Sequence, residues 1–549
     1  MPKSISFRRL PAPNPIFWDY VDNFDKLRRF YNIDYQQPIE KWVSTAELTN
    51  SVKEDLVKGL LASAERWGSG AHVIDNIHKL SQPETLAVVT GQQAGLFGGP
   101  LFTYYKATGA VLWAKEIERV TGRPTVPVFW METSDHDFYE INHIRLLDKE
   151  GEEITLSLTT PPKEKRRVVG SIAFNGEIEQ LVHRLWNLLP ANTNRGPLLE
   201  EIGSIYKPGE TVGDAFARLL NAQFADDGLI VFDAECAQCK KAAIPLIDKI
   251  LATSTDLNKK LTEITEGVQA CGYPPQIQPQ EDRLQLFAKV GDVRIPIDER
   301  GTLLFEDQQP DKVGIEELRR RAQEHPEQFL PKVSLRPIMQ DYLFPTAAYI
   351  AGPSEIAYFA QLKPLYESLD VTMPAIIPRI SITLIETRIK RILDKYHFTP
   401  EELKDGSQKL IRDHLENDPT NDLVSLFAQA RKKWEEIDND LSLGLMRIDP
   451  TLQHPLEKAV QRWQQGLNVL EEKARDALNR KNITTVNQIK KCCMHLLPGG
   501  HFQERRFSLL YYLVHHGSGL AEQIRSQVDI KLYRHQLVYL EKGAGQVSR

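Results

Sequence analysis

Residues 133–143 carry three carboxylates and two histidines, an unusual density of groups that can do chemistry. They suit a divalent metal, general acid–base chemistry, or hydrogen bonds to a ribose or an amine. His136 lies between Asp135 and Asp137, which favours its charged form and hence the stabilisation of a phosphoryl group. A solvated loop whose acidic residues cap the following helix is the alternative interpretation.

Residues 91–100 place four glycines between a β-rich run and a helix-like run. Glycine lets backbone N–H groups approach an anion, and a helix N-terminus adds partial positive charge, so a phosphate or carboxylate ligand is expected. Lys106 would add a cation. The spacing is neither GxGxxG nor that of a Walker loop, which excludes both fingerprints. The alternative is a tight strand-to-helix connection that needs glycine only for its backbone angles.

Two later segments also contain polar residues beside apolar runs. Ser354 and Glu355 are explained by helix capping alone, whereas Arg336, Gln340 and Asp341 have no such local explanation. Residues 378–383 follow another apolar run with a cation and two hydroxyls. They predict a phosphate contact, although an arginine that merely pairs on the surface fits equally well.

Cys236 and Cys239 form a CxxC pair, which can be half of a zinc site. No second pair follows at suitable spacing, and the segment is typical of a helix, so neither zinc binding nor redox chemistry is expected. The five cysteines, an odd number, do not resemble the disulfide framework of a secreted protein.

The elements that must position these loops begin with two apolar runs, 86–90 and 126–131, which end directly before them. A helix-like segment, 101–117, lies between the runs. Apolar strands alternating with helices predict a parallel sheet covered on both faces, with ligands at the carboxyl ends of the strands. Further elements are expected as strands at 228–233, 346–351 and 374–377 and as a helix at 354–369. The two polar loops should therefore open onto one crevice.

Insertions are expected outside this parallel core. Residues 143–174 alternate apolar and polar side chains around a turn and predict a β-hairpin. Helices should follow at 178–189 and 212–225, and residues 285–306 predict a second small antiparallel piece. The core would span residues 1–380, with insertions at about 144–225 and 275–335, and the mainly helical residues before 81 would support the sheet.

From about residue 380 the sequence changes to long charged helices. Apolar residues recur at alternating spacings of three and four, which is the heptad seam of a coiled coil. One seam comprises Leu423, Phe427, Ala430, Trp434, Ile437 and Leu441, and the other Leu456, Val460, Trp463, Leu467, Leu470, Ala474 and Ala477. Prolines at 450 and 455 separate the seams and favour an antiparallel hairpin, while two helices without supercoiling are the alternative. Residues 490–549 are expected to add another helical segment to a C-terminal domain of residues 381–549.

Composition limits the class of protein. A chain of 549 residues exceeds the roughly 250 to 300 residues of a single core, so two or more domains are expected. A net charge of -6 gives no global field for nucleic acid or an anionic membrane. No run approaches the 18 or so apolar residues of a membrane span, and the N-terminus lacks the apolar region of a signal peptide. A cytoplasmic protein is the expectation.

Several motifs together resemble one known family. The segments TGQQAGLFGGPLFTYYKA, VPVFWMETSDHDFYEINH, LRPIMQDYLFPTAAYIAGPSEIAYFAQLKPLY, PRISITL and LPGGHFQERRF are similar to successive signatures of the BshC family, across essentially the whole chain. The resemblance implies a Rossmann-like core with inserted connecting pieces, related in architecture to class I aminoacyl-tRNA synthetases, and a helical coiled-coil domain used in dimerisation. It also implies addition of cysteine to glucosaminyl malate, which gives the thiol bacillithiol.

The residues and the resemblance together predict an ATP-dependent ligase. A carboxylate and an amine do not condense in water, so ATP, with Mg²⁺, would activate the cysteine carboxyl as an adenylate or acyl phosphate, and the glucosamine nitrogen would attack it. Catalytic roles are expected for His136, Asp135, Asp137 and Lys106; phosphate contacts for Gly91, Gln92, Gln93, Gly95, Gly98, Gly99, Arg379 and Ser381; and substrate contacts for Glu140, Asn142, His143, Arg336, Gln340, Asp341, Gly352 and Glu355. The expected partners are the small-molecule substrates and a second copy of the chain, bound through the coiled coil, with no nucleic acid or membrane.

Two other functions stay open. The chain contains neither HIGH nor KMSKS, so adenylate chemistry rests on architectural analogy. A nucleotidyltransferase acting on a small molecule could use the same crevice. A non-catalytic nucleotide-binding scaffold could assemble partners through its coiled coil.

Overall fold

The computed structural model describes residues 4–10, 14–43, 50–280, 282–306, 308–416 and 423–541. Contacts within the chain define two compact units. One is Ile385–His501, and the other joins Pro2–Leu384 to Phe502–Arg549. The sequence predicts a C-terminal domain of residues 381–549. By internal contacts, the part of it from Phe502 onward groups with the larger unit and not with Ile385–His501.

A five-stranded parallel sheet forms the centre of the larger unit, in the order β13-β12-β2-β3-β6. The strands are β2 (Leu86–Gln93), β3 (Thr125–Glu132), β6 (Ile230–Asp233), β12 (Thr346–Ala351) and β13 (Ala375–Pro378). All five expected core strands are therefore confirmed. Their apolar runs are almost wholly buried, because helices cover both faces of such a sheet.

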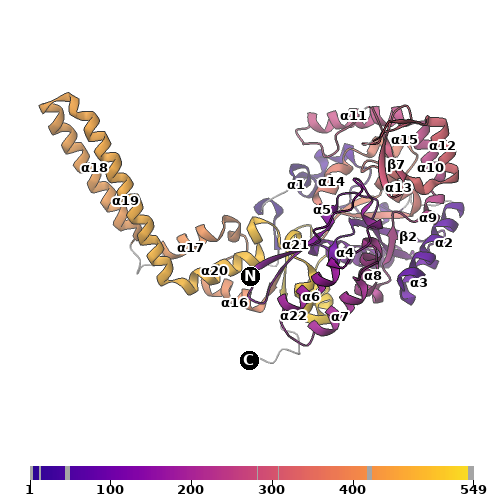
Figure 1. The fold of residues 1–549 in the computed structure, drawn as a ribbon, viewed down its shortest axis with the longest axis horizontal. Helices are drawn as coiled ribbons and strands as arrows, with labels where there is room; N and C mark the ends of the chain where they lie inside the picture. The colour runs from indigo at the N-terminus through magenta and orange to yellow at the C-terminus, as the bar shows by residue number, and fades with distance from the viewer. Residues whose placement is uncertain are drawn as a thin grey trace. The chain divides into compact units, whose positions relative to one another are not determined.

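The helix α4 (Leu101–Thr121) connects β2 to β3 and packs against both strands (Figure 1). It ends at Gly122, whose φ of 67° is left-handed, a common helix terminus. The turn before it is tight. Gly98 and Gly99 have φ of 88° and 68°, and a Cβ on Gly95 would lie 2.9 Å from the Cα of Gly99. The glycines are therefore needed for the backbone path itself.

Two insertions depart from the parallel sheet. The first contains the antiparallel pair β4 (His143–Leu147) and β5 (Glu153–Ser157), which confirms the hairpin, but residues 167–174 form only a short 3-10 turn and isolated bridges. Its helices are α6 (Glu177–Leu188), α7 (Arg195–Ile205) and α8 (Val212–Gln223). The second is an antiparallel sheet in the order β10-β9-β8-β7-β11. Its strands are β7 (Arg283–Val290), β8 (Val293–Asp298), β9 (Thr302–Leu303), β10 (Asp311–Lys312) and β11 (Phe329–Pro331).

The remaining helices of this unit surround the sheet. The expected single helix 354–369 is two helices, α14 (Pro353–Phe359) and α15 (Lys363–Ser368). The others before the last segment are α1 (Pro15–Asp22), α2 (Asn50–Trp67), α3 (Ala71–Lys79), α5 (Phe138–Ile141), α9 (Ala237–Lys241), α10 (Ile244–Ala252), α11 (Ser254–Ala270), α12 (Ile315–Glu324) and α13 (Arg336–Leu343).

The last segment of the chain was expected to be helical. In the structure it contains a strand as well as helices. After α21 (Gln503–Arg506), α22 (Leu509–His516) and α23 (Leu520–Arg525) it ends in β15 (His535–Leu540). This strand lies between β1 (Ser4–Ile5) and β14 (Ser381–Glu386) in a three-stranded sheet. The backbone N–H of Leu101, at the start of α4, donates to the carbonyl of Phe507, so the returning segment covers the beginning of that helix.

The smaller unit contains the predicted helical hairpin. Its two long helices, α18 (Leu423–Ile448) and α19 (Gln453–Lys481), run antiparallel in Figure 1, and the rings of Trp434 and Trp463 stack between them with centroids 4.6 Å apart. Shorter helices at its base are α16 (Thr387–Tyr396), α17 (Ser407–Glu416) and α20 (Ile483–Leu496).

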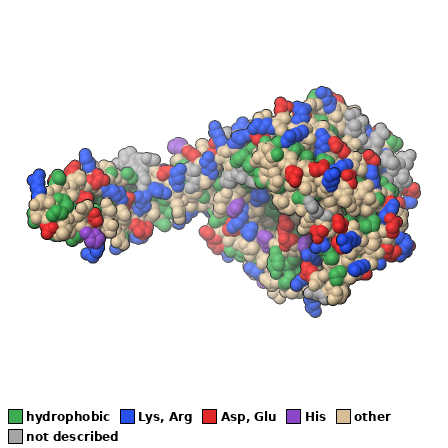
Figure 2. All heavy atoms as spheres, turned by 90° about the horizontal axis from the view of Figure 1, so that it is seen from above, with side chains coloured by type: hydrophobic (Ala, Val, Ile, Leu, Met, Phe, Trp, Pro, Cys, Tyr) green, Lys and Arg blue, Asp and Glu red, His purple; other side chains and the backbone are tan. Residues whose placement is uncertain are grey.

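Charge is spread evenly over the visible surface. On the face shown in Figure 2, basic and acidic side chains are interspersed over the described residues without a large patch of either sign. Among the described residues, every helix is too short or too polar to cross a bilayer.

The Gly95 turn gives a testable prediction. Gly95→Ala should lower the free energy of unfolding by about 1–3 kcal/mol, because its Cβ would collide with backbone rather than with a movable side chain. Gly267→Ala, in α11, is the control, since nothing lies within 4 Å of its Cβ and a helical Gly→Ala change stabilises by about 0.5–1 kcal/mol. Urea unfolding, followed by circular dichroism, measures the stability of both variants. Equal unfolding midpoints of the two variants would contradict the requirement for glycine at position 95.

Candidate functional site

A cavity of about 390 Å³ opens to solvent at the carboxyl ends of the central strands. Of the residues expected in a site, those that line it are Gly91, Gln92, Gln93, Lys106, Asp135, Glu140, Arg336, Gly352, Glu355 and Arg379. Those outside its lining are His136, Asp137, Asn142, His143, Gly95, Gly98, Gly99, Gln340, Asp341 and Ser381. The structure thus brings half of the expected residues together, and their chemical roles stay predictions.

A buried ion pair forms the floor of this cavity. Lys106 reaches from α4, only 3% exposed, with Nζ 2.5 Å from Oε2 of Glu355. The same Nζ donates to the carbonyl of Gly91 at 2.6 Å and to Oε1 of Gln92 at 3.1 Å. Glu355 in turn accepts from the Tyr349 hydroxyl and from the backbone N–H of Gly352, each at 2.6 Å. Both charged groups are therefore paired and hydrogen-bonded, as burial requires.

The pKa values of the pair follow from burial and attraction. Burial lowers the pKa of Lys106, although the Glu355 carboxylate opposes this. Burial alone would raise the pKa of Glu355, but the adjacent ammonium and the hydrogen bonds hold it below its usual range. The carboxylate therefore stays ionised at neutral pH.

Arg336, from α13, is held in the cavity wall by neutral groups. Its guanidinium donates to Oε1 of Gln340 at 3.0 Å and to the hydroxyls of Tyr349 and Tyr358 at 3.2 and 3.1 Å. Among the described residues, no carboxylate pairs with it. Its positive charge is consequently available to an anionic ligand.

Gln340 and Asp341 support this arginine from behind instead of lining the cavity. The Gln340 amide donates to Asp341 at 2.8 Å, and the Tyr366 hydroxyl donates to the other Asp341 oxygen at 2.6 Å. Burial raises the pKa of Asp341 to about 6. The expected substrate contacts of both residues do not fit this geometry.

Carboxylates gather at the β3 end of the cavity. Asp135 accepts from the Arg294 guanidinium at 3.0 Å and from the backbone N–H of His136 at 2.7 Å. Burial would raise the pKa of Asp135, but these contacts bring it well below its usual range. Partial burial and the neighbouring carboxylates raise the pKa of Glu140, which accepts from Gln93 at 2.9 Å.

His136 is not held between two carboxylates, as its neighbours in the sequence suggested. Asp137 turns away and caps α5, accepting from the backbone N–H groups of Tyr139 and Glu140 at 3.0 and 3.2 Å. The capping alternative is therefore confirmed for Asp137. His136 stays 43% exposed beside Asp135, and the Arg294 guanidinium lies 3.3 Å from its Nδ1. Arg294 thus places a positive charge beside both Asp135 and His136.

Asn142 and His143 make their contacts within the first insertion. The Asn142 amide donates to the carbonyl of Leu158 at 2.8 Å, and its oxygen lies 3.1 Å from Nδ1 of His143. Burial lowers the pKa of His143. These contacts join the start of β4 to the end of β5, which explains both residues without a ligand.

Gly95, Gly98 and Gly99 do not form a phosphate cradle. Their backbone N–H groups donate within the turn, to the carbonyls of Gln93, Gly95 and Leu96. The alternative, a tight connection that needs glycine for its geometry, therefore fits the structure. Gly91 differs from them, because it lies on β2 and its carbonyl receives Lys106.

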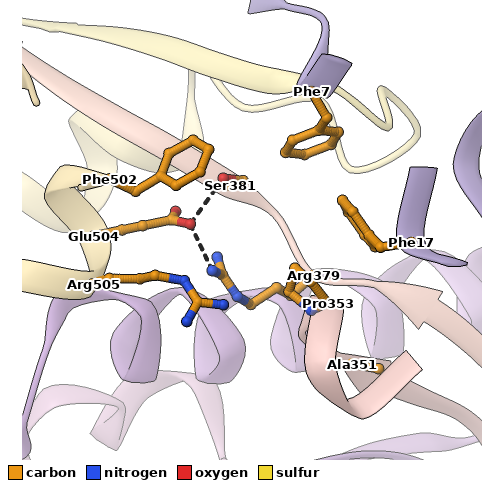
Figure 3. Close-up of a pocket in the computed structure, with 9 residues that line it drawn as sticks. All are labelled: Phe7, Phe17, Ala351, Pro353, Arg379, Ser381, Phe502, Glu504 and Arg505. Atoms are coloured by element: carbon orange, nitrogen blue, oxygen red, sulfur yellow. Dashed lines mark hydrogen bonds and ion pairs between the residues drawn. The ribbon is translucent and has the colours of Figure 1, made fainter. Parts of the chain in front are cut away.

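A small side pocket adjoins the cavity at its β13 end (Figure 3). Its centre is Glu504, which is fully buried and accepts from Arg379 at 2.5 Å, from the Ser381 hydroxyl at 2.9 Å and from the backbone N–H of Ile382 at 2.9 Å. Burial would raise the pKa of Glu504, but Arg379 holds it below its usual range. The Ser381 hydroxyl is therefore already bound to Glu504, although Ser381 also lines the side pocket.

Arg505 is the second cation at this end. Figure 3 shows its guanidinium directed toward that of Arg379. It lines both the cavity and the side pocket, and no carboxylate of the described residues lies within ion-pair distance. Among the described residues, the one ion pair that these two adjacent guanidinium groups make is that of Arg379 with Glu504, so the two cations favour a bound anion.

The cavity is consequently polarised. Arg379 follows β13, whereas Glu132 ends β3, three strand spacings away in the sheet. At about 4.8 Å per spacing, the backbones that carry Arg379 and Glu132 lie about 14 Å apart. Such a separation fits an elongated ligand, or two ligands, with anionic groups at one end and amino groups at the other.

Sequence reasoning missed several lining residues. Glu132 ends an expected strand directly before the polar loop, so its position was a usable signal. Arg505 belongs to one of the motif blocks, but nothing local indicated where it lies. Arg294, on β8 of the second insertion, carried no signal at all.

Comparison with known proteins agrees with this architecture. The family model for the N-terminal Rossmann-like domain of bacillithiol biosynthesis BshC matches residues 3–380, and that for its C-terminal coiled-coil domain matches residues 382–540. The chain belongs to the BshC family. The Rossmann-like core, the coiled coil and the resemblance seen in the motifs are thereby confirmed.

Curated BshC relatives span nearly the whole chain. A protein of Salinibacter ruber is 34% identical over 95% of this chain and 96% of its own length, and one of Chlorobaculum tepidum is 30% identical over 95% and 96%. A third, from Desulforamulus reducens, is 28% identical over 98% and 99%. Each carries the name "Putative cysteine ligase BshC". The cationic end of the cavity combines Arg379 from the first BshC domain model with Arg505 from the second.

The buried pair gives a prediction of stability. Lys106→Met should lower the free energy of unfolding by about 3–5 kcal/mol, because it leaves the Glu355 carboxylate buried without its cation. Lys115→Met on the same helix is the control, since its ion pair with Asp227 is largely exposed on the lysine side and such pairs contribute about 0–1 kcal/mol.

The same comparison of wild type and Lys106→Met can be repeated at different pH values. The folded pKa of Glu355 is lowered, so the stability that it contributes is present above its unfolded pKa, about 4.3, and is lost as the pH falls through the folded value. The difference between wild type and Lys106→Met should therefore shrink in acid. A difference that stays constant from pH 7 to pH 3 would contradict the pairing.

Proposed function

We propose that this protein is an ATP-dependent ligase that joins the carboxyl group of cysteine to the amine of glucosaminyl malate in bacillithiol biosynthesis. The family and the names of its relatives support cysteine ligation. The polarised cavity supports this reaction in particular, because it offers cations to phosphate and carboxylate groups and carboxylates to an amine.

The chemistry requires activation of the carboxylate. Cysteine attacks ATP through a carboxylate oxygen and forms an acyl adenylate or an acyl phosphate, releasing pyrophosphate or ADP. The glucosamine nitrogen then attacks the acyl carbon, the amide bond forms, and AMP or phosphate leaves with the oxygen. The nitrogen must lose a proton, so a base beside it is needed.

The cationic end is suited to the nucleotide. Arg379 and Arg505 would contact the phosphates. Arg336, which lies between the two ends beside Gly91 and Trp130 and has no carboxylate partner among the described residues, would bind the cysteine carboxylate. Lys106, fixed by Glu355 and the end of β2, would act through charge and position.

The acidic end is suited to the amine. Glu132 and Asp135 would attract the ammonium form of the acceptor, and Glu140, whose pKa is raised, would take the proton as the nitrogen attacks. Among the described residues, no cluster of three or more His, Cys, Asp or Glu side chains could hold a metal ion. We propose that Mg²⁺ enters with the nucleotide.

The decisive experiment is a reconstitution. Purified protein incubated with ATP, Mg²⁺, cysteine and glucosaminyl malate should form bacillithiol, detected by mass spectrometry, with release of AMP or ADP. Pyrophosphate release that needs no cysteine would favour a nucleotidyltransferase instead. Absence of any amide product would overturn the ligase proposal.

Glu140 provides the kinetic prediction. Glu140→Gln should lower kcat about 10²–10⁴-fold with little change in KM for ATP, because the amide cannot accept the proton. A carboxylate base is active above its pKa, so the wild-type rate should fall as the pH drops through the raised pKa of Glu140. The rate of Glu140→Gln should not show this fall at acidic pH. Glu150→Gln, at an exposed turn, is the control, and equal rates for both variants would exclude Glu140 as the base.

We also propose that the protein is a homodimer through the coiled coil. Several residues of the heptad seams stay exposed in the single chain: Ile437 is 44%, Leu441 37%, Trp463 36% and Leu470 58% exposed. Apolar seam positions are normally buried against another helix, and a second copy would supply one.

Sedimentation analysis tests the dimer. Leu470→Lys should convert the dimer to a monomer, because it places a charge at an exposed apolar position of the seam. Val290→Lys changes a comparably exposed valine on β7 and should leave the dimer intact. A monomeric wild type, or a dimeric Leu470→Lys variant, would contradict the proposal.

A further inference from the structure

Cys236 and Cys239 lie together outside the cavity, directly after β6. Cys236 is the residue before α9 and is partly exposed, whereas Cys239 lies within α9 and is buried. The helix packs on α2 at Gly59, where a Cβ would lie 3.1 Å from Sγ of Cys236 and closer still to Sγ of Cys239. Both sulfurs therefore share the small hollow that this glycine leaves.

The backbone allows the two sulfurs to bond. Residues three apart within a helix have Cβ atoms about 5–6 Å apart, too far for the 3.5–4.5 Å that a disulfide needs. Cys236 is not helical, since its φ of -61° and ψ of 104° are extended. Its Cβ is consequently not fixed at the helical distance.

The two thiols also differ in acidity. The hydrogen bond from the Cys239 thiol lowers the pKa of Cys236 to about 7, against burial, which opposes ionisation. The same contact, with burial, raises the pKa of Cys239 well above its usual range. At neutral pH the more accessible sulfur is thus partly thiolate and the buried one is a thiol, which is the division of roles between an attacking and a resolving cysteine.

We propose that Cys236 and Cys239 form a reversible dithiol–disulfide site that exchanges with small-molecule disulfides. The Cys236 thiolate attacks one sulfur of the disulfide, whose S–S bond breaks and expels one thiolate. Cys239 then loses its proton and attacks the Cys236 sulfur, which releases the second thiol. The protein gives up two electrons and two protons, and the small disulfide is reduced to two thiols.

This site is independent of the proposed ligase activity. Neither cysteine lines the cavity. The helix α9 is held by contacts of its own, since Lys240 pairs with Glu235 at 3.1 Å and donates to the carbonyl of Glu327 at 3.3 Å. Disulfide formation can therefore be measured without any assay of ligation.

The experiment uses the full-length protein with cystine as the oxidant. After acid quenching and alkylation of free thiols, peptide mass analysis should show that the peptide containing both cysteines has lost two hydrogens and escaped alkylation, and dithiothreitol should reverse this. Cys239→Ser should instead accumulate a mixed disulfide at Cys236. Cys236→Ser should lower the rate of reaction at this peptide by about tenfold or more.

Controls separate this site from general thiol oxidation. Cys271→Ser removes an exposed cysteine elsewhere and should not change the disulfide at 236 and 239. Circular dichroism establishes that the serine variants fold, and the wild-type result stands even if they do not. Two fully alkylated cysteines after equilibration of the wild type with cystine, or equal reaction rates of the two serine variants, would overturn the proposal.

Discussion

The buried ion pair of Lys106 and Glu355 is the interaction on which the candidate site depends. It joins α4 to the first turn of α14, and through Gly91 it also fixes the end of β2. Two charges removed from water are tolerated only when their remaining hydrogen-bonding capacity is filled, and here Gln92, Tyr349 and Gly352 fill it. The floor of the cavity is therefore held by a closed set of hydrogen bonds, and the other charged side chains of the cavity lie around it.

Those surrounding charges differ in how far the protein has already neutralised them. Asp135 and Arg379 each have an opposite charge within ion-pair distance, Arg294 and Glu504 respectively. Arg336 is bound by neutral groups alone, and Arg505 has no carboxylate at ion-pair distance among the described residues. A ligand gains most where charge is left uncompensated, so Arg336 and Arg505 are the cations with most to offer an anion. In the proposed reaction the paired groups would set position, and the unpaired ones would supply binding energy.

The fold was largely predictable because its signals are local. Each core strand is an apolar run followed at once by polar residues, and the seams of α18 and α19 repeat at heptad spacing. Strand β15 was missed because a helical expectation for the whole last segment hid its short alternating run, His535–Leu540. The site was half predictable for the same reason. The strand ends place Gly91 and Glu132. Arg294 and Arg505 reach the cavity only through long-range packing, which the sequence does not show. The same holds for the local roles of Asp137, which caps a helix, and Gly98, which shapes a turn.

The two distant arginines also explain why the cavity needs more than the parallel sheet. Arg294 comes from the second insertion and neutralises Asp135 at one end, while Arg505 comes from the segment that returns after the helical unit and joins Arg379 at the other. Without Arg294 the acidic end would carry three carboxylates with no described cation in contact with Asp135, and their repulsion would raise their pKa values. Without residues 503–506, Arg379 would lose Glu504 and the start of α4 would lose part of its cover. The polarity of the site is therefore a product of segments more than 150 residues from the loops that first suggested it.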